Sequence, residues 1–139
     1  MQRKYKILLV DDMPEWLNSH SNMLELLFGE DFFEIEYAIS AKNAFSKVIS
    51  NTEAPYDLII ADLEMENIAD ESYAGAWLVK NLQNKEICKN TGFLIISGSY
   101  DIEKVAGELK ISYIPKDSIL INPLSLEYKV NELLNIVSC

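Results

Sequence analysis

The 139-residue chain lacks the features of a membrane, secreted or zinc-stabilised protein. No uninterrupted apolar run exceeds four residues, whereas a membrane-spanning helix needs about 20. The only cysteines are Cys88 and Cys139, too few for a disulfide framework or a four-ligand zinc site. Only Ile7–Val10 follow the basic N-terminus before two aspartates, too short for the apolar core of a secretion signal. We therefore expect a cytoplasmic protein that does not bind membranes.

Basic residues are also scarce, with 12 Lys and Arg against 22 Asp and Glu, a net charge of −10. Residues 11–36 hold eight carboxylates and residues 62–71 hold five, with no Lys or Arg in either stretch. Such concentrated negative charge repels a phosphate backbone. We therefore expect no direct binding of nucleic acid by this domain.

Short apolar runs alternate with segments of helical spacing along the whole chain. The runs predict five strands, at Tyr5–Val10, Phe33–Ile39, Tyr56–Ala61, Phe93–Ser97 and Ile111–Ile114. Several runs contain no polar residue, which is typical of parallel strands covered on both faces. Apolar residues at helical spacing follow each strand, beginning at Trp16, Ala41, Leu78, Ile102 and Leu126, and the last set ends at Val137. The pattern predicts an open α/β sheet wound on both faces, in one domain over residues 1–139.

Two polar side chains are predicted to cap helices. Ser40 precedes the helix that begins at Ala41, and Asp101 precedes the one that begins at Ile102. Gly107 lies inside the latter helix and costs about 1 kcal/mol relative to Ala. That helix is therefore expected to be the least stable.

Polar residues that could bind a ligand or react lie at the ends of four of the predicted strands. Asp11 and Asp12 follow the first, Asp62 the third, Ser97 ends the fourth, and Lys116 follows the fifth. The carboxyl ends of parallel strands meet at one edge of a sheet, so these residues are expected to converge. Three close carboxylates repel one another unless a cation lies among them, and Mg²⁺ is the hard ion that suits oxygen ligands. A lysine beside such a site would favour binding of a phosphoryl group.

Four segments resemble the signature segments of two-component response-regulator receiver domains. They are Lys6–Glu15, Tyr56–Met65, Leu94–Gly98 and Tyr113–Lys116, and the resemblance runs from about Lys6 to Val137. It implies a flavodoxin-like, doubly wound five-stranded parallel sheet, the (βα)5 receiver fold. It also implies a phosphorelay protein whose only chemistry is its own phosphorylation and dephosphorylation, and which is not an enzyme otherwise.

The resemblance assigns a role to each residue of the cluster. Asp62 would be the phosphoacceptor, phosphorylated by a histidine kinase or a histidine phosphotransfer protein in a Mg²⁺-dependent reaction. Lys116 would pair with one phosphoryl oxygen and Ser97 would bind another, while Tyr113 would turn inward as the aromatic switch residue. The implied metal ligands are Asp11, mainly through water, Asp12, Asp62 and the backbone carbonyl of Glu64.

The resemblance further implies that phosphorylation switches the face formed by the fourth helix, the fifth strand and the fifth helix, a face that also serves homodimers. Two alternatives remain. An aspartate-nucleophile phosphatase of the haloacid-dehalogenase type would place its nucleophile after the first strand, with a second Asp two residues on, whereas Asp62 follows the third strand and is trailed by Glu64. A pseudo-receiver scaffold would not need the acidic cluster, Ser97 and Lys116.

Several residues depart from the family pattern or have no role in it. Twelve residues separate Asp62 from Gly75, and the acidic surplus within residues 66–73 is expected to stay loose and to control access to Asp62. Lys116 is followed by Asp117, where many receivers carry Pro. The single histidine, His20, is expected to pack or cap, and Trp16 to belong to the core or its rim.

Overall fold

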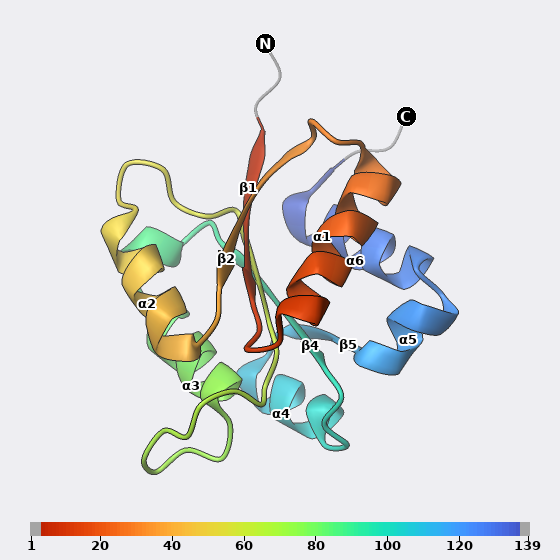
Figure 1. Cartoon of the computed structure of the whole chain (residues 1–139). Helices are drawn as coiled ribbons and strands as arrows, with labels where there is room; N and C mark the ends of the chain where they lie inside the picture. The colour runs from red at the N-terminus through yellow and green to blue at the C-terminus, as the bar shows by residue number, and fades with distance from the viewer. Residues whose placement is uncertain (1–3, 137–139) are drawn as a thin grey trace.

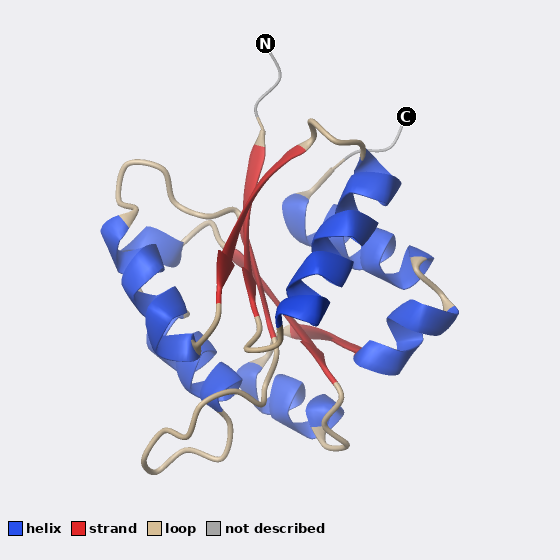
Figure 2. Cartoon of the chain, viewed as in Figure 1, coloured by secondary structure: helices blue, strands red, loops and turns tan. Residues whose placement is uncertain are grey.

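Five parallel strands form one sheet, and helices cover both of its faces (Figures 1 and 2). The structure, a computed structural model, describes residues 4–136. The strands pair in the order β2-β1-β3-β4-β5, so the predicted flavodoxin-like doubly wound sheet is confirmed. They are β1 (Tyr5–Val10), β2 (Phe33–Ala38), β3 (Leu58–Ala61), β4 (Gly92–Ser97) and β5 (Ser112–Pro115). The helices are α1 (Pro14–Phe28), α2 (Ala41–Ser50), α3 (Ala74–Leu82), α4 (Ile102–Leu109), α5 (Lys116–Ile121) and α6 (Leu124–Leu134), with a 3-10 turn η1 (Glu86–Cys88) before β4.

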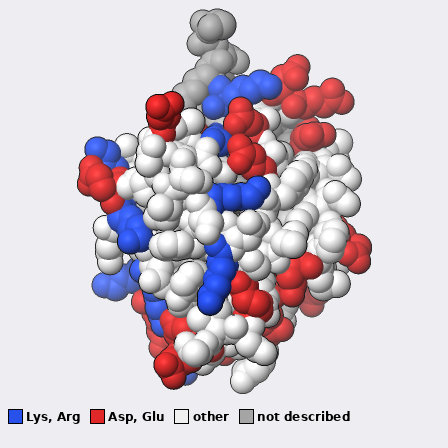
Figure 3. Space-filling view, turned by 60° about the vertical axis from the view of Figure 1, so that its left-hand side comes forward, with Lys and Arg blue, Asp and Glu red and all other residues white. Residues whose placement is uncertain are grey.

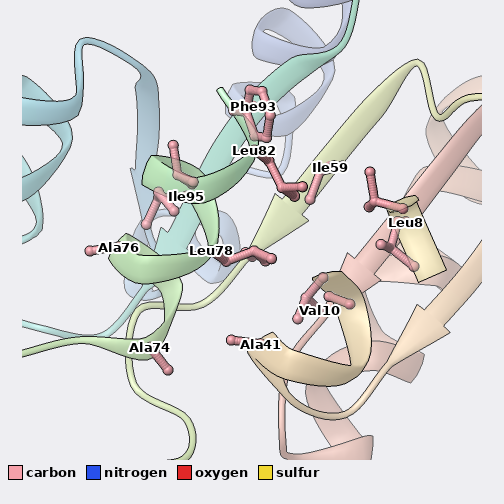
Figure 4. Packing of buried hydrophobic residues seen from close by; sticks show 14 of the residues in the cluster. Leu8, Val10, Ala41, Ile59, Ala74, Ala76, Leu78, Leu82, Phe93 and Ile95 are labelled. Carbon is pink, nitrogen blue, oxygen red and sulfur yellow. The ribbon is translucent and has the colours of Figure 1, made fainter. Parts of the chain in front are cut away.

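The alternating side chains of the strands divide the core into two layers. Leu8 and Val10 of β1 pack with α2, α3 and α4, whereas Ile7 and Leu9 pack with α1, α5 and α6. Figure 4 shows side chains of α2 and α3 lying against Leu8, Val10 and Ile59 of the sheet. Full burial of each Leu or Ile contributes roughly 1.5–3 kcal/mol, so burial on both faces explains why these strands lack polar residues.

The strand order reverses between β1 and β3, and this reversal marks the place for a site. The residues just past β1 and β3 continue the strand pairing, because Asp11 N donates to Ala38 O of β2 at 3.1 Å and Asp62 N donates to Val10 O of β1 at 3.1 Å. In open α/β sheets, ligands bind beyond the carboxyl ends of the strands at such a switch point. The fold therefore places Asp11 and Asp62 side by side at this edge.

The two predicted helix caps have different outcomes. The side chain of Ser40 accepts a hydrogen bond from Asn43 N at 3.0 Å, so the predicted cap of α2 is confirmed. Asp101 stands at the N-cap position of α4 but its side chain makes no capping bond. Its carboxylate instead accepts a hydrogen bond from the Tyr73 hydroxyl at 2.6 Å. The prediction that Asp101 caps α4 is therefore wrong, because its backbone, with φ −103° and ψ 22°, lies outside the extended conformation that is typical of a capping residue.

The chain after β5 differs from the sequence-based expectation. Pro115 leads directly into α5, whose first residue is Lys116, and the helix predicted last along the chain is α6. In α5 only Lys116 and Ile119 are buried, too few for a recognisable helical pattern. No peptide bond among residues 4–136 is cis, so the Lys116–Asp117 bond is trans. Val137, expected in the last helix, lies outside the described residues. None of the helices within residues 4–136 has the length and apolar character needed to cross a membrane.

Candidate functional site

A buried lysine joins two buried carboxylates at the switch point. The Nζ atom of Lys116 lies 2.9 Å from Asp62 Oδ2 and 3.1 Å from Asp11 Oδ2. Only 1% of Asp11 and 7% each of Asp62 and Lys116 are exposed, so solvent screens these pairs weakly. The predicted convergence of these three residues is confirmed by the structure. A group with one positive and two negative charges is left with a surplus of negative charge that can attract a cation.

Burial and charge pairing determine the protonation of this cluster. Burial raises the pKa of Asp11, and this effect outweighs the Met13 N–H and the Lys116 charge, which lower it. Burial alone would lower the pKa of Lys116, but the hydrogen bond to Asp62 and the charges of Asp62 and Asp11 raise it overall. Lys116 therefore remains an ammonium at neutral pH and can donate a hydrogen bond to a further anionic oxygen.

The backbone around Asp62 fixes the orientation of its carboxylate. Asp62 Oδ1 accepts hydrogen bonds from Leu63 N at 2.7 Å and from Glu64 N at 3.4 Å, which leaves Oδ2 directed to Lys116. Gly75 packs directly on this turn and donates its N–H to Leu63 O at 3.0 Å. A Cβ at position 75 would overlap the carbonyl oxygen of Asp62 and lie 2.8 Å from Leu63 Cα. Glycine is therefore required for α3 to approach the turn that follows β3.

The donors at this edge suit a hard cation. Asp11 and Asp62 supply buried carboxylates, and Asp12 is exposed beside them. No group of three or more His, Cys, Asp or Glu side chains within residues 4–136 is arranged to hold a metal. Mg²⁺ is usually bound by one or two carboxylates together with water and phosphate oxygens, so the Asp11–Asp62 pair fits it without a third side chain. The expected direct ligation by Asp12 stays a prediction.

Ser97 belongs to a chain of hydrogen bonds that ends at Glu64. Its hydroxyl donates to Ser99 Oγ at 3.1 Å, and the Ser99 hydroxyl donates to Glu64 Oε1 at 2.7 Å. The carboxylate of Glu64 is thus held by Ser99 of the β4–α4 loop. The sequence analysis did not single out Ser99, although its spacing of two residues from Ser97 is visible in the sequence. Tyr113 is half-buried on β5 and packs towards the core layer of α4, and its switch role stays a prediction.

Two aromatic side chains of α1 lie beside Lys116. The Nζ atom of Lys116 is 4.6 Å from the ring centroid of Trp16, and the His20 ring lies 5.5 Å from the Trp16 ring. His20 is 4% exposed, and its Nδ1 atom has no hydrogen-bond partner. Burial, with a smaller contribution from the Lys116 charge, lowers the pKa of His20 to about 4. The expectation that His20 packs is confirmed, and Trp16 forms a wall of the site.

The acidic segment of residues 66–73 has more contacts than its composition predicted. Glu66 accepts hydrogen bonds from Ala41 N at 2.8 Å and Lys42 N at 3.0 Å, at the start of α2. The Tyr73 hydroxyl binds Asp101, and Glu71 pairs with Lys80 of α3 at 3.3 Å. The expectation of a loose segment considered only the apolar area of the segment itself. The partners in α2, in α3 and at the N-cap position of α4 contradict that premise.

Solved structures similar to this chain are receiver domains. No protein-family model and no curated protein matches the sequence. A CheY-like response regulator receiver domain from Methylobacillus flagellatus is 26% identical, with 94% of this chain and 99% of that chain covered and a TM-score of 0.72. The chemotaxis response regulator CheY4 of Vibrio cholerae is 22% identical, over 95% and 100% of the two chains, with a TM-score of 0.70. The phosphorylated cyanobacterial phytochrome response regulator RcpA is 17% identical, over 99% and 98%, with a TM-score of 0.75.

The fold and the site together show which class of protein this is. It is a doubly wound α/β domain with a buried cluster of two carboxylates and one lysine at the switch point of its sheet. Within that class, the chain has the fold of a response-regulator receiver domain. The resemblance indicated by the four sequence segments is confirmed at this level.

Proposed function

We propose that this chain is a phosphoacceptor receiver domain whose acceptor is Asp62. An oxygen of the Asp62 carboxylate attacks the phosphorus of a phosphohistidine on a donor protein. The P–N bond breaks, its electron pair leaves with the donor imidazole, and an aspartyl phosphate remains on this chain. Later attack of water on the phosphorus releases inorganic phosphate and restores Asp62. The observation that carries the proposal is the position of Lys116, 2.9 Å from Asp62 and 3.1 Å from Asp11 in a buried cluster.

Each residue of the cluster has a separate role in the proposed transfer. Lys116 holds a phosphoryl oxygen and offsets the charge that develops during transfer, because an ammonium in a buried site acts at short range without much screening. Asp11, Asp12, Asp62 and the carbonyl of Glu64 are the groups that would hold Mg²⁺. When bound, the ion supplies positive charge beside the phosphoryl oxygens. Ser97 leaves Ser99 to bind a phosphoryl oxygen, and Tyr113 moves with it.

The donor is a histidine kinase or a histidine phosphotransfer protein. In Figure 3, Lys and Arg side chains lie over the middle and left of the face, while Asp and Glu side chains gather at its upper right and lower parts. The segments that flank the acceptor, residues 11–36 and 62–71, contain no Lys or Arg. A donor with a basic surface would therefore associate faster with this chain, in a salt-dependent way. We expect the output, including any homodimer, to use α4, β5 and α6, with α5 beside them.

The alternatives predict different behaviour of the same residues. A pseudo-receiver scaffold would bind its partner without labelling and without dependence on Asp62. An aspartate-nucleophile phosphatase would turn over added phosphate esters many times, whereas a receiver takes one phosphoryl group per chain. The strand position of Asp62 and the contact with Lys116 favour the receiver.

The test is intact-mass analysis after incubation with acetyl phosphate and Mg²⁺. The parent chain should gain one phosphoryl group, and the gain should disappear with a chelator or in Asp62→Asn. Asp70→Asn is the matched control, because Asp70 lies exposed in the same loop with a φ of 65°, a conformation that Asn tolerates. Equal labelling of Asp62→Asn would refute the acceptor assignment, and no labelling of the parent would favour the scaffold.

A further inference from the structure

The ammonium of Lys116 has an aromatic partner as well as its two carboxylates. Trp16 lies in the first turn of α1, and its ring centroid is 4.6 Å from Lys116 Nζ. A cation within about 6 Å of an indole centroid is attracted by the negative face of the ring. The contact therefore joins α1, which follows β1, to Lys116, which follows β5.

Lysine needs such support more than arginine does in a site of this kind. Its ammonium sits on a flexible four-carbon stem, and an exposed form of it is strongly hydrated. Lys116 is buried, so the groups around it must replace that hydration. Asp62 and Asp11 do so from one side, and the half-buried indole of Trp16 does so at a distance where it can fix the direction of the side chain.

His20 supports the indole from within the core. Its ring lies one helical turn further along α1, 5.5 Å from the Trp16 ring and inclined by 37°. The buried imidazole is neutral at physiological pH, so it adds no positive charge near Lys116. Its Nδ1 atom has no hydrogen-bond partner, so that side of the ring is held by packing. The order of contacts is therefore His20, Trp16 and Lys116.

We propose that Trp16 is a positioning residue, which holds the Lys116 ammonium at Asp62 through its indole face. The proposal rests on the function proposed above for its effect on phosphorylation, but the contact between Trp16 and Lys116 can be tested without any phosphorylation. Trp16 contacts the Lys116 ammonium, and in this proposal it acts through that residue. Loss of the aromatic face should therefore matter only while the ammonium is present.

The first experiment compares Trp16→Leu and Trp16→Phe, both checked for cooperative thermal unfolding. The rate of labelling by acetyl phosphate at saturating Mg²⁺ should fall about tenfold in Trp16→Leu, the equivalent of ~1.4 kcal/mol for a cation over an indole in a largely desolvated site. Trp16→Phe retains an aromatic face and should recover most of that rate. In a Lys116→Met background, which labels slowly, Trp16→Leu should cause no further loss. Equal losses in Leu and Phe variants, or the same loss without the lysine, would overturn the proposal.

The second experiment uses fluorescence and needs no phosphodonor. The chain has two tryptophans, so Trp77→Phe leaves Trp16 as the only one. In that protein, Lys116→Met should shift the emission of Trp16, because a positive charge beside the indole is removed, whereas Lys104→Met should not. An unchanged emission spectrum would refute the contact. A parent chain that cannot be labelled but shows the shift would instead refute the proposed function and leave the contact standing.

Discussion

The buried histidine makes the stability of this chain depend on pH in a way that can be calculated. His20 is the single histidine, it is 4% exposed, and its pKa is lowered to about 4 by burial and by the nearby Lys116 charge. In the unfolded chain its pKa returns to the ordinary value of about 6.5. Between these two pH values the unfolded state binds a proton that the folded state does not bind.

The sign and size of the effect follow from this difference. Stability rises with pH wherever the unfolded state binds more protons, so the contribution is fully present above about pH 6.5 and is lost as the pH falls towards 4. At 1.36 kcal/mol per pKa unit, the whole loss is roughly 3 kcal/mol, of which about 2 kcal/mol occurs between pH 7 and pH 5. This is a large part of the roughly 5–15 kcal/mol that stabilises a typical domain.

The assay is urea unfolding of the parent and of His20→Leu at pH 7 and pH 5. The variant removes the titrating group while keeping an apolar side chain of similar size, so other titrations, such as that of Asp11, cancel in the comparison. The free energy of unfolding of the parent should fall by about 2 kcal/mol more than that of the variant. A proton NMR titration of the one histidine should also give a midpoint near 4. Equal pH dependence of both proteins, or a midpoint near 6.5, would refute the reasoning.

Four further substitutions, in two matched pairs, test how the elements are held around the site. Gly75→Ala should destabilise the fold by ~1–3 kcal/mol or more, because a Cβ there overlaps the Asp62 carbonyl, and it should also slow labelling of Asp62. Gly107→Ala is the matched control, because a Cβ at that position meets nothing within 4 Å. Since alanine favours a helix more than glycine does, this variant should have a free energy of unfolding higher by up to ~1 kcal/mol. Glu66→Ala should cost ~1 kcal/mol by removing the acceptor for two N–H groups at the start of α2, whereas Asn67→Ala should cost little. Urea unfolding measures all of these, and an unaltered Gly75→Ala protein would contradict the packing described here.

Much of the fold could be predicted because its signals are local. The run Ile7–Val10 shows a strand buried on both faces, and the spacing from Ala41 to Val48 shows a helix with one apolar side. The convergence of Asp11, Asp62 and Lys116 followed from the same pattern, since parallel strands deliver their carboxyl ends to one edge. The sequence therefore predicted the features that depend on the periodicity of the apolar residues and on the topology of the sheet.

The helix α5 shows where a local signal is too weak. Its six residues make fewer than two turns, and only two of them are buried, so the apolar period that identifies α6 has no room to develop. The helix forms because the chain leaves β5 at Pro115 with a backbone suited to a helix start, and because Ile119 packs into the layer of α1 and α6. Its effect on the site is direct, since its first residue is Lys116.

The contacts around the site were beyond prediction because each depends on two distant segments. Nothing in Glu66 indicates that its carboxylate meets the N–H groups of α2, 24 and 25 residues away along the chain. The same holds for Ser99 with Glu64, and for Trp16 with a lysine that follows the last strand. An entropy argument from composition assigned residues 66–73 to a loose loop, yet a carboxylate at a helix N-terminus gains both hydrogen bonds and a favourable dipole. Acidic residues in a connecting segment can therefore be structural, and in this chain Glu66 joins the loop after β3 to the start of α2.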